Sequence, residues 1–217
     1  MSTEAERELF RSRLLRWGKE NRRDFPWRRT NDPYKILVTE ILLQRTLAQK
    51  VVPVSEELFS RWSTLGELAD ADRDEVADVL EPLGLQNRRA KALVEIGGRL
   101  SQSGVPKNEE DLLELPFVGR YAANATLCFA FGEARAVVDV NVVRIYGRVF
   151  GFNWESDQDS HAWEFAEEML PDDQAQEYNL ALLDFGATVC TASNPACSVC
   201  PLSEMCEYFQ TENAIQD

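Results

Sequence analysis

Four of the five cysteines lie within 17 residues near the end of the chain, at the spacing Cys190-x6-Cys197-x2-Cys200-x5-Cys206. The chain opens without a secretion signal, so we expect a reducing compartment, where such thiolates bind a metal centre rather than form disulfides. Spacing alone leaves tetrahedral zinc and a four-iron cluster as alternatives. The fifth cysteine, Cys128, lies in an apolar run and is expected to be a small buried residue.

A single carboxylate, Asp139, interrupts the apolar run VVDVNVVRI. It is placed to cap a helix that continues through Val142, Tyr146 and Val149. A carboxylate fixed in this way could also stabilise positive charge that develops on a substrate. The capping and catalytic roles are compatible, and the segment alone does not choose between them.

A second acidic residue, Glu40, stands in the helical segment YKILVTEILLQRT. On a helix it shares a face with Ile36, Leu37 and Leu43. We therefore expect Glu40 to be partly buried and to hold or share a proton. The alternative is an exposed ion pair with Lys35.

The segment LLELPFVGRYAANA reads as a short helix, a tight turn and a second helix rich in small residues. The turn is expected to present the backbone N–H groups of Val118 to Tyr121 at a helix N-terminus. Such groups bind a phosphate without reading base sequence. An ordinary pair of packed helices is the alternative.

Helical periodicity dominates the elements that must position these residues. Asp32 and Pro33 predict a helix start, because Asp caps helices and Pro fits their first turn. The only β-like stretch, 136–138, is too short to build a sheet. The sequence therefore predicts an all-α protein of about ten helices at the usual helix length.

The net charge of −14 is unevenly distributed. Residues 151–217 contain 14 acidic residues and no Lys or Arg, so all 23 basic residues lie in residues 1–150 with 23 acidic ones. We interpret the excess acid as a solvated surface typical of a salt-loving host. We expect the basic groups of the first part to be free to meet phosphate. These groups are Arg22–Arg23, Arg28–Arg29, and Arg88–Arg89 with Lys91.

Taken together, these segments resemble the endonuclease III/MutY (HhH-GPD) superfamily of DNA glycosylases, over nearly the whole chain. LPFVGRYAANA is similar to its helix-hairpin-helix, VVDVNVVRI to its catalytic-aspartate segment, and the cysteine spacing to its [4Fe-4S] loop. The resemblance implies a two-lobed all-α fold with DNA in the groove between the lobes. It places a six-helix barrel with the hairpin at 31–137 and a cluster lobe at 1–30 plus 138–217, with the cluster loop at 190–206.

Two positions indicate the branch of the superfamily. Glu40 is similar to the glutamate of MutY-like enzymes, which endonuclease III lacks. Tyr121 stands where bifunctional enzymes carry a Schiff-base lysine and MutY proteins usually a serine. With the short length, these residues resemble most closely the archaeal Mig-type thymine glycosylases that act on T/G mismatches. This resemblance implies a monofunctional enzyme that hydrolyses the N-glycosidic bond of thymine or uracil opposite guanine in double-stranded DNA.

By the same resemblance the catalytic residues are Asp139, Glu40 and Tyr121. The implied DNA-binding residues are Gln44, Arg45, Leu85, Arg88, Pro116, Val118, Gly119 and Arg120. Gln44, Arg45 and Leu85 would fill the space left by the extruded base; otherwise they would be surface polar groups and a core leucine.

Two departures from the family pattern affect this interpretation. Phe117 replaces the usual first glycine of the hairpin, so its turn must form without an achiral residue. The loop 191–196 has no Lys or Arg. We therefore expect a structural cluster with a weaker role in DNA binding.

The expected protein is a monomer in the cytoplasm, associated with the nucleoid, with no membrane segment. Two other functions remain open at this point. The first is a short adenine glycosylase acting on A opposite G. The second is a non-catalytic DNA-binding iron–sulfur protein.

Overall fold

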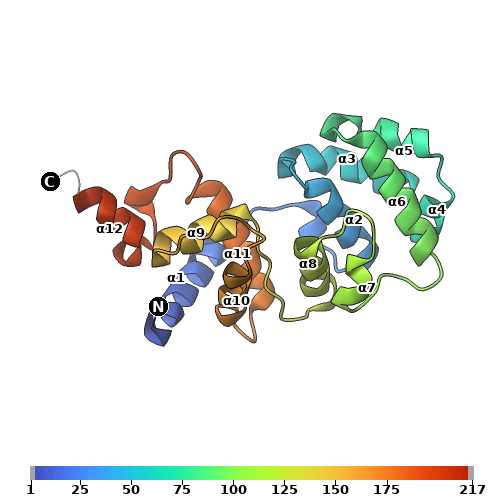
Figure 1. Cartoon of the computed structure of the whole chain (residues 1–217). Coiled ribbons are helices and arrows are strands. Elements are labelled where there is room, and N and C mark those ends of the chain that lie inside the picture. Colours follow the sequence, from blue (N-terminus) through green and yellow to red (C-terminus); the bar gives the residue numbers. More distant parts are fainter. Residues whose placement is uncertain (1–2, 215–217) are drawn as a thin grey trace. The chain divides into compact units, whose positions relative to one another are not determined.

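The computed structural model describes residues 3–214, which form α-helices and short 3₁₀-helices without any strand in that range (Figure 1). The predicted all-α class is confirmed. Within the described residues no helix has the length and apolar character needed to cross a membrane.

The chain divides into two compact units. The central unit is Asp24–Glu133, and the terminal unit combines the described residues before Asp24 with those from Ala134 onward. The helices of the central unit are α2 (Pro33–Leu43), α3 (Ala48–Arg61), α4 (Leu65–Ala69), α5 (Arg73–Leu80), α6 (Gln86–Leu100), α7 (Glu109–Leu113) and α8 (Arg120–Phe131). Those of the terminal unit are α1 (Glu4–Asn21), α9 (Val140–Phe150), α10 (Ser160–Glu168), α11 (Ala175–Thr188) and α12 (Glu207–Ala214).

The breaks between the units lie a few residues from those expected at 31 and 137. Trp27 stacks on Phe25, with ring centroids 4.8 Å apart, and packs against the central core. Ala136 and Val138 instead belong to the core of the terminal unit. Each residue near a boundary thus belongs to the unit whose core its side chain contacts.

In the central unit, α2 provides much of the core and positions Glu40. The Asp32 carboxylate caps α2 by accepting from the Tyr34 N–H at 3.0 Å, as predicted, and Pro33 occupies the first turn. Every residue from Ile36 to Leu42 is buried. Helix α2 packs against α8, and α6 packs against α4 and α5.

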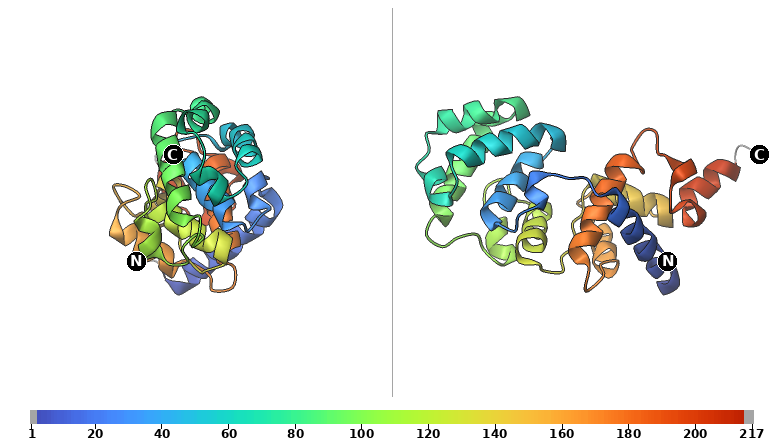
Figure 2. Two further views of the ribbon diagram at one scale, coloured as in Figure 1. Left: turned by 90° about the vertical axis from the view of Figure 1, so that its right-hand side faces the viewer. Right: turned by 180° about the vertical axis from the view of Figure 1, so that it is seen from behind.

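In the terminal unit, α1 lies alongside α11, although the two helices are far apart in the sequence (Figures 1 and 2). Gly18 allows this close approach, because a Cβ atom there would lie 2.5 Å from the Cβ of Ala181. Helix α9 packs against α11 and α12. The buried face of α9 includes Ile145 and Tyr146, and the hydroxyl of Tyr146 lies 3.0 Å from that of Tyr178.

Two adjacent glycines of α6 test this packing. We predict that Gly97→Ala lowers the free energy of unfolding by about 1–3 kcal/mol, because its Cβ would lie 2.6 Å from the backbone nitrogen of Ala69 on α4. Gly98→Ala is the matched control, since no atom lies within 4 Å of its Cβ. Alanine there should stabilise the helix by about 0.5–1 kcal/mol. Urea unfolding of both variants measures the difference, and equal stabilities would contradict the close contact between α4 and α6.

Candidate active site and cluster loop

Asp139 caps α9, as its place before the helix predicted. One carboxylate oxygen accepts from the backbone N–H groups of Asn141 at 2.8 Å and Val142 at 2.9 Å. The other accepts from the Asn141 side-chain amide at 2.6 Å. The carboxylate is half-buried, so it is held in one orientation without being sealed from solvent.

Asn141 connects this carboxylate to the cysteine loop. Its amide oxygen accepts from the Arg144 guanidinium at 2.9 Å. Arg144 also donates to the backbone carbonyls of Gly186 and Cys190, each at 2.9 Å. Gly186 is required at this point, because a Cβ atom would lie 2.7 Å from the Cβ of Asn141. A continuous set of hydrogen bonds therefore runs from Asp139 to the first cysteine of the loop.

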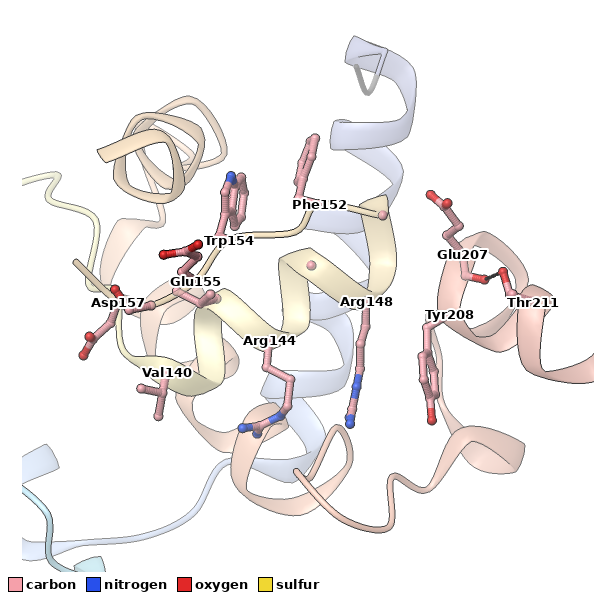
Figure 3. Close-up of a pocket in the computed structure, with 14 residues that line it drawn as sticks. Val140, Arg144, Arg148, Phe152, Trp154, Glu155, Asp157, Glu207, Tyr208 and Thr211 are labelled. Carbon is pink, nitrogen blue, oxygen red and sulfur yellow. Dashed lines mark hydrogen bonds between the residues drawn. The ribbon is translucent and has the colours of Figure 1, made fainter. Parts of the chain in front are cut away.

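Arg144 and Arg148 extend from the same side of α9 (Figure 3). They border a pocket of about 510 Å³ between α9, the segment 151–157 and α12. The guanidinium of Arg148 lies 4.9 Å from the centroid of the Tyr208 ring. It donates to the carbonyls of Thr191 at 2.7 Å and Ala192 at 2.9 Å, so it holds the start of the cysteine loop.

The four clustered cysteines all belong to the terminal unit. Cys190 and Cys206 are buried, and Cys197 and Cys200 are half-buried. The Sγ atom of Cys190 lies 3.5 Å from the Arg148 guanidinium, and that of Cys200 accepts from the Leu202 N–H at 3.4 Å. Cys128 is 1% exposed, which confirms the expected small buried residue.

The chemistry of these thiols fits a cationic metal centre, either zinc or an iron cluster. Burial above all, together with the charges of the other three cysteines, raises the pKa of the Cys200 thiol to about 11. Burial likewise raises the pKa of Cys206. Four neighbouring thiolates repel one another, whereas positive metal ions would stabilise all four. Among residues 3–214, no three His, Cys, Asp or Glu side chains converge as ligands of a single ion.

Glu40 and Tyr121 belong to two central-unit helices that pack together, α2 and α8. Glu40 is 4% exposed, so the expected burial is confirmed and an exposed pair with Lys35 is wrong. Tyr121 is half-buried in the first turn of α8 and packs against the central core. Asp139 lies in the other unit.

The hairpin turn forms despite the missing glycine. Phe117 adopts a φ of 64°, in the left-handed region that favours glycine. Gly119 caps α8, and Arg120 faces Glu109 at 3.8 Å. The expectation for Val118 is wrong, because its N–H donates to the Leu115 carbonyl at 3.2 Å inside the turn. The donors at the N-terminus of α8 therefore begin after Val118.

Three further predicted DNA-binding residues occupy exposed positions near loops. Leu85 is 48% exposed, so it is not a core leucine. Arg45 is exposed, and Arg88 lies with its guanidinium 5.6 Å from the Phe117 ring centroid. The Gln44 side chain instead donates to the Phe117 carbonyl at 2.7 Å.

Several arginines expected to meet phosphate have other partners. Arg89 is 1% exposed and lies inside the central unit. Arg23 donates to the buried Asp184 carboxylate at 2.6 Å, and Arg29 pairs with Asp24. A pair of neighbouring arginines in a sequence does not show which of the two faces solvent.

The sequence pattern did not predict Asn141, Arg144 and Arg148 as functional candidates. Their spacing from Asp139 carried a signal, because Arg144 and Arg148 are four residues apart and share one face of a helix. Their acceptors, in the loop after α11, could not be inferred from that spacing.

Comparison with known proteins agrees with this geometry. Residues 38–171 match the family of HhH-GPD superfamily base excision DNA repair proteins, and residues 190–206 match the iron–sulfur binding domain of endonuclease III. The second match favours an iron–sulfur centre over zinc.

Relatives cover almost the whole chain. A thymine/uracil-DNA glycosylase of Methanothermobacter thermautotrophicus is 38% identical, over 96% of this chain and 97% of its own. The human adenine DNA glycosylase is 34% identical, over 95% of this chain but 40% of its own. The structure of a thermostable thymine-DNA glycosylase superposes with a TM-score of 0.92 at 36% identity, covering 97% of this chain and all of that one.

The capping aspartate, the hairpin and the cysteine loop thus occur together in a chain whose relatives excise bases from DNA. The protein belongs to the HhH-GPD superfamily of base excision repair DNA glycosylases.

Proposed function

We propose that this glycosylase removes thymine or uracil opposite guanine from double-stranded DNA, as a monomer acting on the chromosome, and leaves an abasic site. The observation that carries the proposal is the fixed Asp139 carboxylate with its three hydrogen-bond donors. The substrate class is supported by Tyr121 and by the thymine/uracil enzyme that resembles this chain over almost its full length.

Asp139 would act on charge that exists only during the reaction. Breaking the N-glycosidic bond develops positive charge on the sugar, and a fixed carboxylate stabilises that charge more than the neutral ground state. The bonds from Asn141 leave the carboxylate little freedom to turn away. In this role Asp139 can also orient the attacking water.

Glu40 and Tyr121 would serve the departing base. A base leaves more readily when it accepts a hydrogen bond or a proton. Burial of Glu40 and the position of Tyr121 in the first turn of α8 support this assignment. A mispaired base is also easier to rotate out of the duplex, and this difference supplies part of the selectivity.

The remaining predicted residues would bind the DNA itself. The hairpin residues Pro116, Val118, Gly119 and Arg120 would contact the phosphate backbone, with Val118 contributing turn shape rather than its N–H group. Leu85 and Arg45 would fill the vacated space, and Gln44 and Arg88 would support them. The exposed side chains of Leu85 and Arg45 support this division.

Adenine opposite guanine is the second candidate substrate. Glu40 and the similarity to the human adenine enzyme favour it. Tyr121 opposes it. A purely structural DNA-binding role would leave Asp139 and Glu40 without a function.

For the metal centre we propose a [4Fe-4S] cluster held by Cys190, Cys197, Cys200 and Cys206. When bound, it would fix the loop that Arg144 and Arg148 hold by backbone carbonyls. The absence of Lys and Arg from residues 191–196 supports a structural role with little direct contact to phosphate.

Replacing Asp139 by asparagine separates catalysis from binding. We expect Asp139→Asn to bind a T/G duplex within about threefold of wild type and to cleave it about a hundredfold to a thousandfold more slowly. Asparagine also caps helices, so α9 should persist. Single-turnover cleavage and fluorescence anisotropy measure the two effects.

Asp159→Asn is the matched control, because Asp159 caps α10 by accepting from the His161 N–H at 2.9 Å. It should leave both cleavage and binding unchanged. If Asp139→Asn cleaved at the wild-type rate, Asp139 would be only a helix cap.

The absence of strand cleavage is a second expected outcome. Cutting by β-elimination normally needs an amine that forms a Schiff base with the opened sugar. Tyr121 has no amine, and Lys107, the last lysine of the chain, lies with its Nζ atom 5.5 Å from the Phe131 ring centroid. A T/G duplex treated with the enzyme should therefore break only after alkali.

Breaks without alkali, or a borohydride-trapped complex, would show lyase activity. Parallel U/G and A/G duplexes identify the base. Removal of A opposite G with T/G untouched would assign the protein to the adenine branch.

The cluster proposal predicts yellow-brown protein with about four irons per chain after anaerobic purification. Cys200→Ala should lower the iron content, whereas Cys128→Ala, which changes a buried cysteine outside the loop, should retain it. Colourless protein with one zinc per chain would contradict the proposal.

A further inference from the structure

Three loops of the central unit contain residues with unusual backbone conformation. Arg45, Leu85 and Phe117 have φ values of 54°, 53° and 64°, and they are the only non-glycine residues of 3–214 with positive φ. For an L-amino acid this conformation is strained, so surrounding contacts must hold each residue in place. All three lie near residues proposed to contact DNA.

One buried arginine joins two of these loops. The guanidinium of Arg89 donates to the carbonyls of Leu83 at 3.0 Å and Gly84 at 2.8 Å, directly before Leu85. It also donates to the Gln44 carbonyl at 2.6 Å and the Thr46 hydroxyl at 3.0 Å, on either side of Arg45. A single planar group therefore holds both strained residues from within.

The third loop is connected through Gln44. Its side-chain amide donates to the carbonyl of Phe117 at 2.7 Å, while its own carbonyl accepts from Arg89. The three loops are thus joined into one set of hydrogen bonds that begins at Arg89.

Stability alone is a poor explanation for this arginine. Its partners are carbonyls and a hydroxyl rather than a carboxylate, and burial lowers its pKa. A buried charge whose acceptors are neutral loses hydration, and apolar residues of similar volume often stabilise a fold equally well. The rigid fork of donors on a guanidinium can fix one loop conformation through directional hydrogen bonds, whereas an apolar side chain cannot.

Arg45 and Leu85 have exposed side chains, and Arg89 bonds to the backbone carbonyl of the residue before each of them. Leu85 is 48% exposed, and it directly follows Gly84, whose carbonyl accepts a hydrogen bond from Arg89. An apolar side chain on a fixed loop can enter a base step and unstack it. Such insertion unstacks the bases only if the loop is rigid, because a flexible loop would move away instead.

We propose that Arg89 is a positioning residue for base extrusion, which acts by holding the loops of Arg45 and Leu85 rigid against the DNA. This inference rests on the proposed DNA-binding role of Leu85. Arg89 itself contacts no DNA, because its side chain is buried.

The test is a double-mutant cycle between Arg89→Lys and Leu85→Ala. Lysine keeps the charge but cannot reach four acceptors as a planar fork. Base unstacking is measured by 2-aminopurine fluorescence beside a T/G mismatch at saturating protein, and cleavage by single-turnover rates. If Arg89 acts through Leu85, Arg89→Lys should reduce both signals about tenfold in the wild-type background and less than about twofold in the Leu85→Ala background.

Arg61→Lys, on α3 of the same unit, is the matched control, because Arg61 pairs with Glu57 at the surface. It should change neither signal. Equal losses from Arg89→Lys in both backgrounds would overturn the proposal and leave Arg89 a purely structural residue.

Thr46→Val replaces Arg89→Lys in the cycle if the lysine variant unfolds below the assay temperature. It removes one acceptor of Arg89 and should give a smaller loss, of about threefold, that again disappears in the Leu85→Ala background. A wild-type protein that unstacks the mismatch without cleaving any duplex would refute the proposed function but not this inference. A protein whose unstacking is insensitive to Leu85→Ala would refute the inference alone.

Discussion

The hydrogen bonds between Asp139 and the first turn of α9 are the interaction on which the proposed chemistry depends. They fix the carboxylate to the helix, and the helix is fixed in turn by its buried face in the terminal unit. Asn141 and Arg144 extend the same set of contacts to the cysteine loop. The position of the proposed catalytic carboxylate is therefore determined by the packing of a whole unit.

The features that could be predicted from the sequence follow local rules. Asp32 and Asp139 were identified as helix caps because a capping side chain bonds to the next few residues. The burial of Glu40 and Cys128 followed from helical periodicity and apolar neighbours. The cysteine loop and the hairpin were recognisable because their residues lie close together in the chain.

The remaining features depend on contacts between distant segments. Arg89 looked like its neighbour Arg88, but its acceptors include residues of the loop after α2. The N–H of Val118 looked available because the turn around Phe117 was unknown. The ends of the central unit differ from the expected bounds of 31 and 137, because Trp27 packs against the central core and Ala136 packs in the core of the terminal unit. The sequence pattern shows which side chains can donate hydrogen bonds, but it does not show which distant carbonyls the fold brings close enough to accept them.

The order of the units along the chain has a consequence for how the protein forms during synthesis. The central unit is one continuous stretch, whereas the terminal unit needs partners as distant as Arg23 and Asp184, which are 161 residues apart. The Phe10 ring on the buried face of α1 packs against Tyr146 and Phe150 of α9 and Tyr178 of α11, so its partners are all synthesised after the central unit. The central unit can therefore complete its core first, while the few apolar residues of α1, such as Phe10 and Leu14, stay exposed. The core of the terminal unit, unlike that of the central unit, is complete only after α11 has been synthesised.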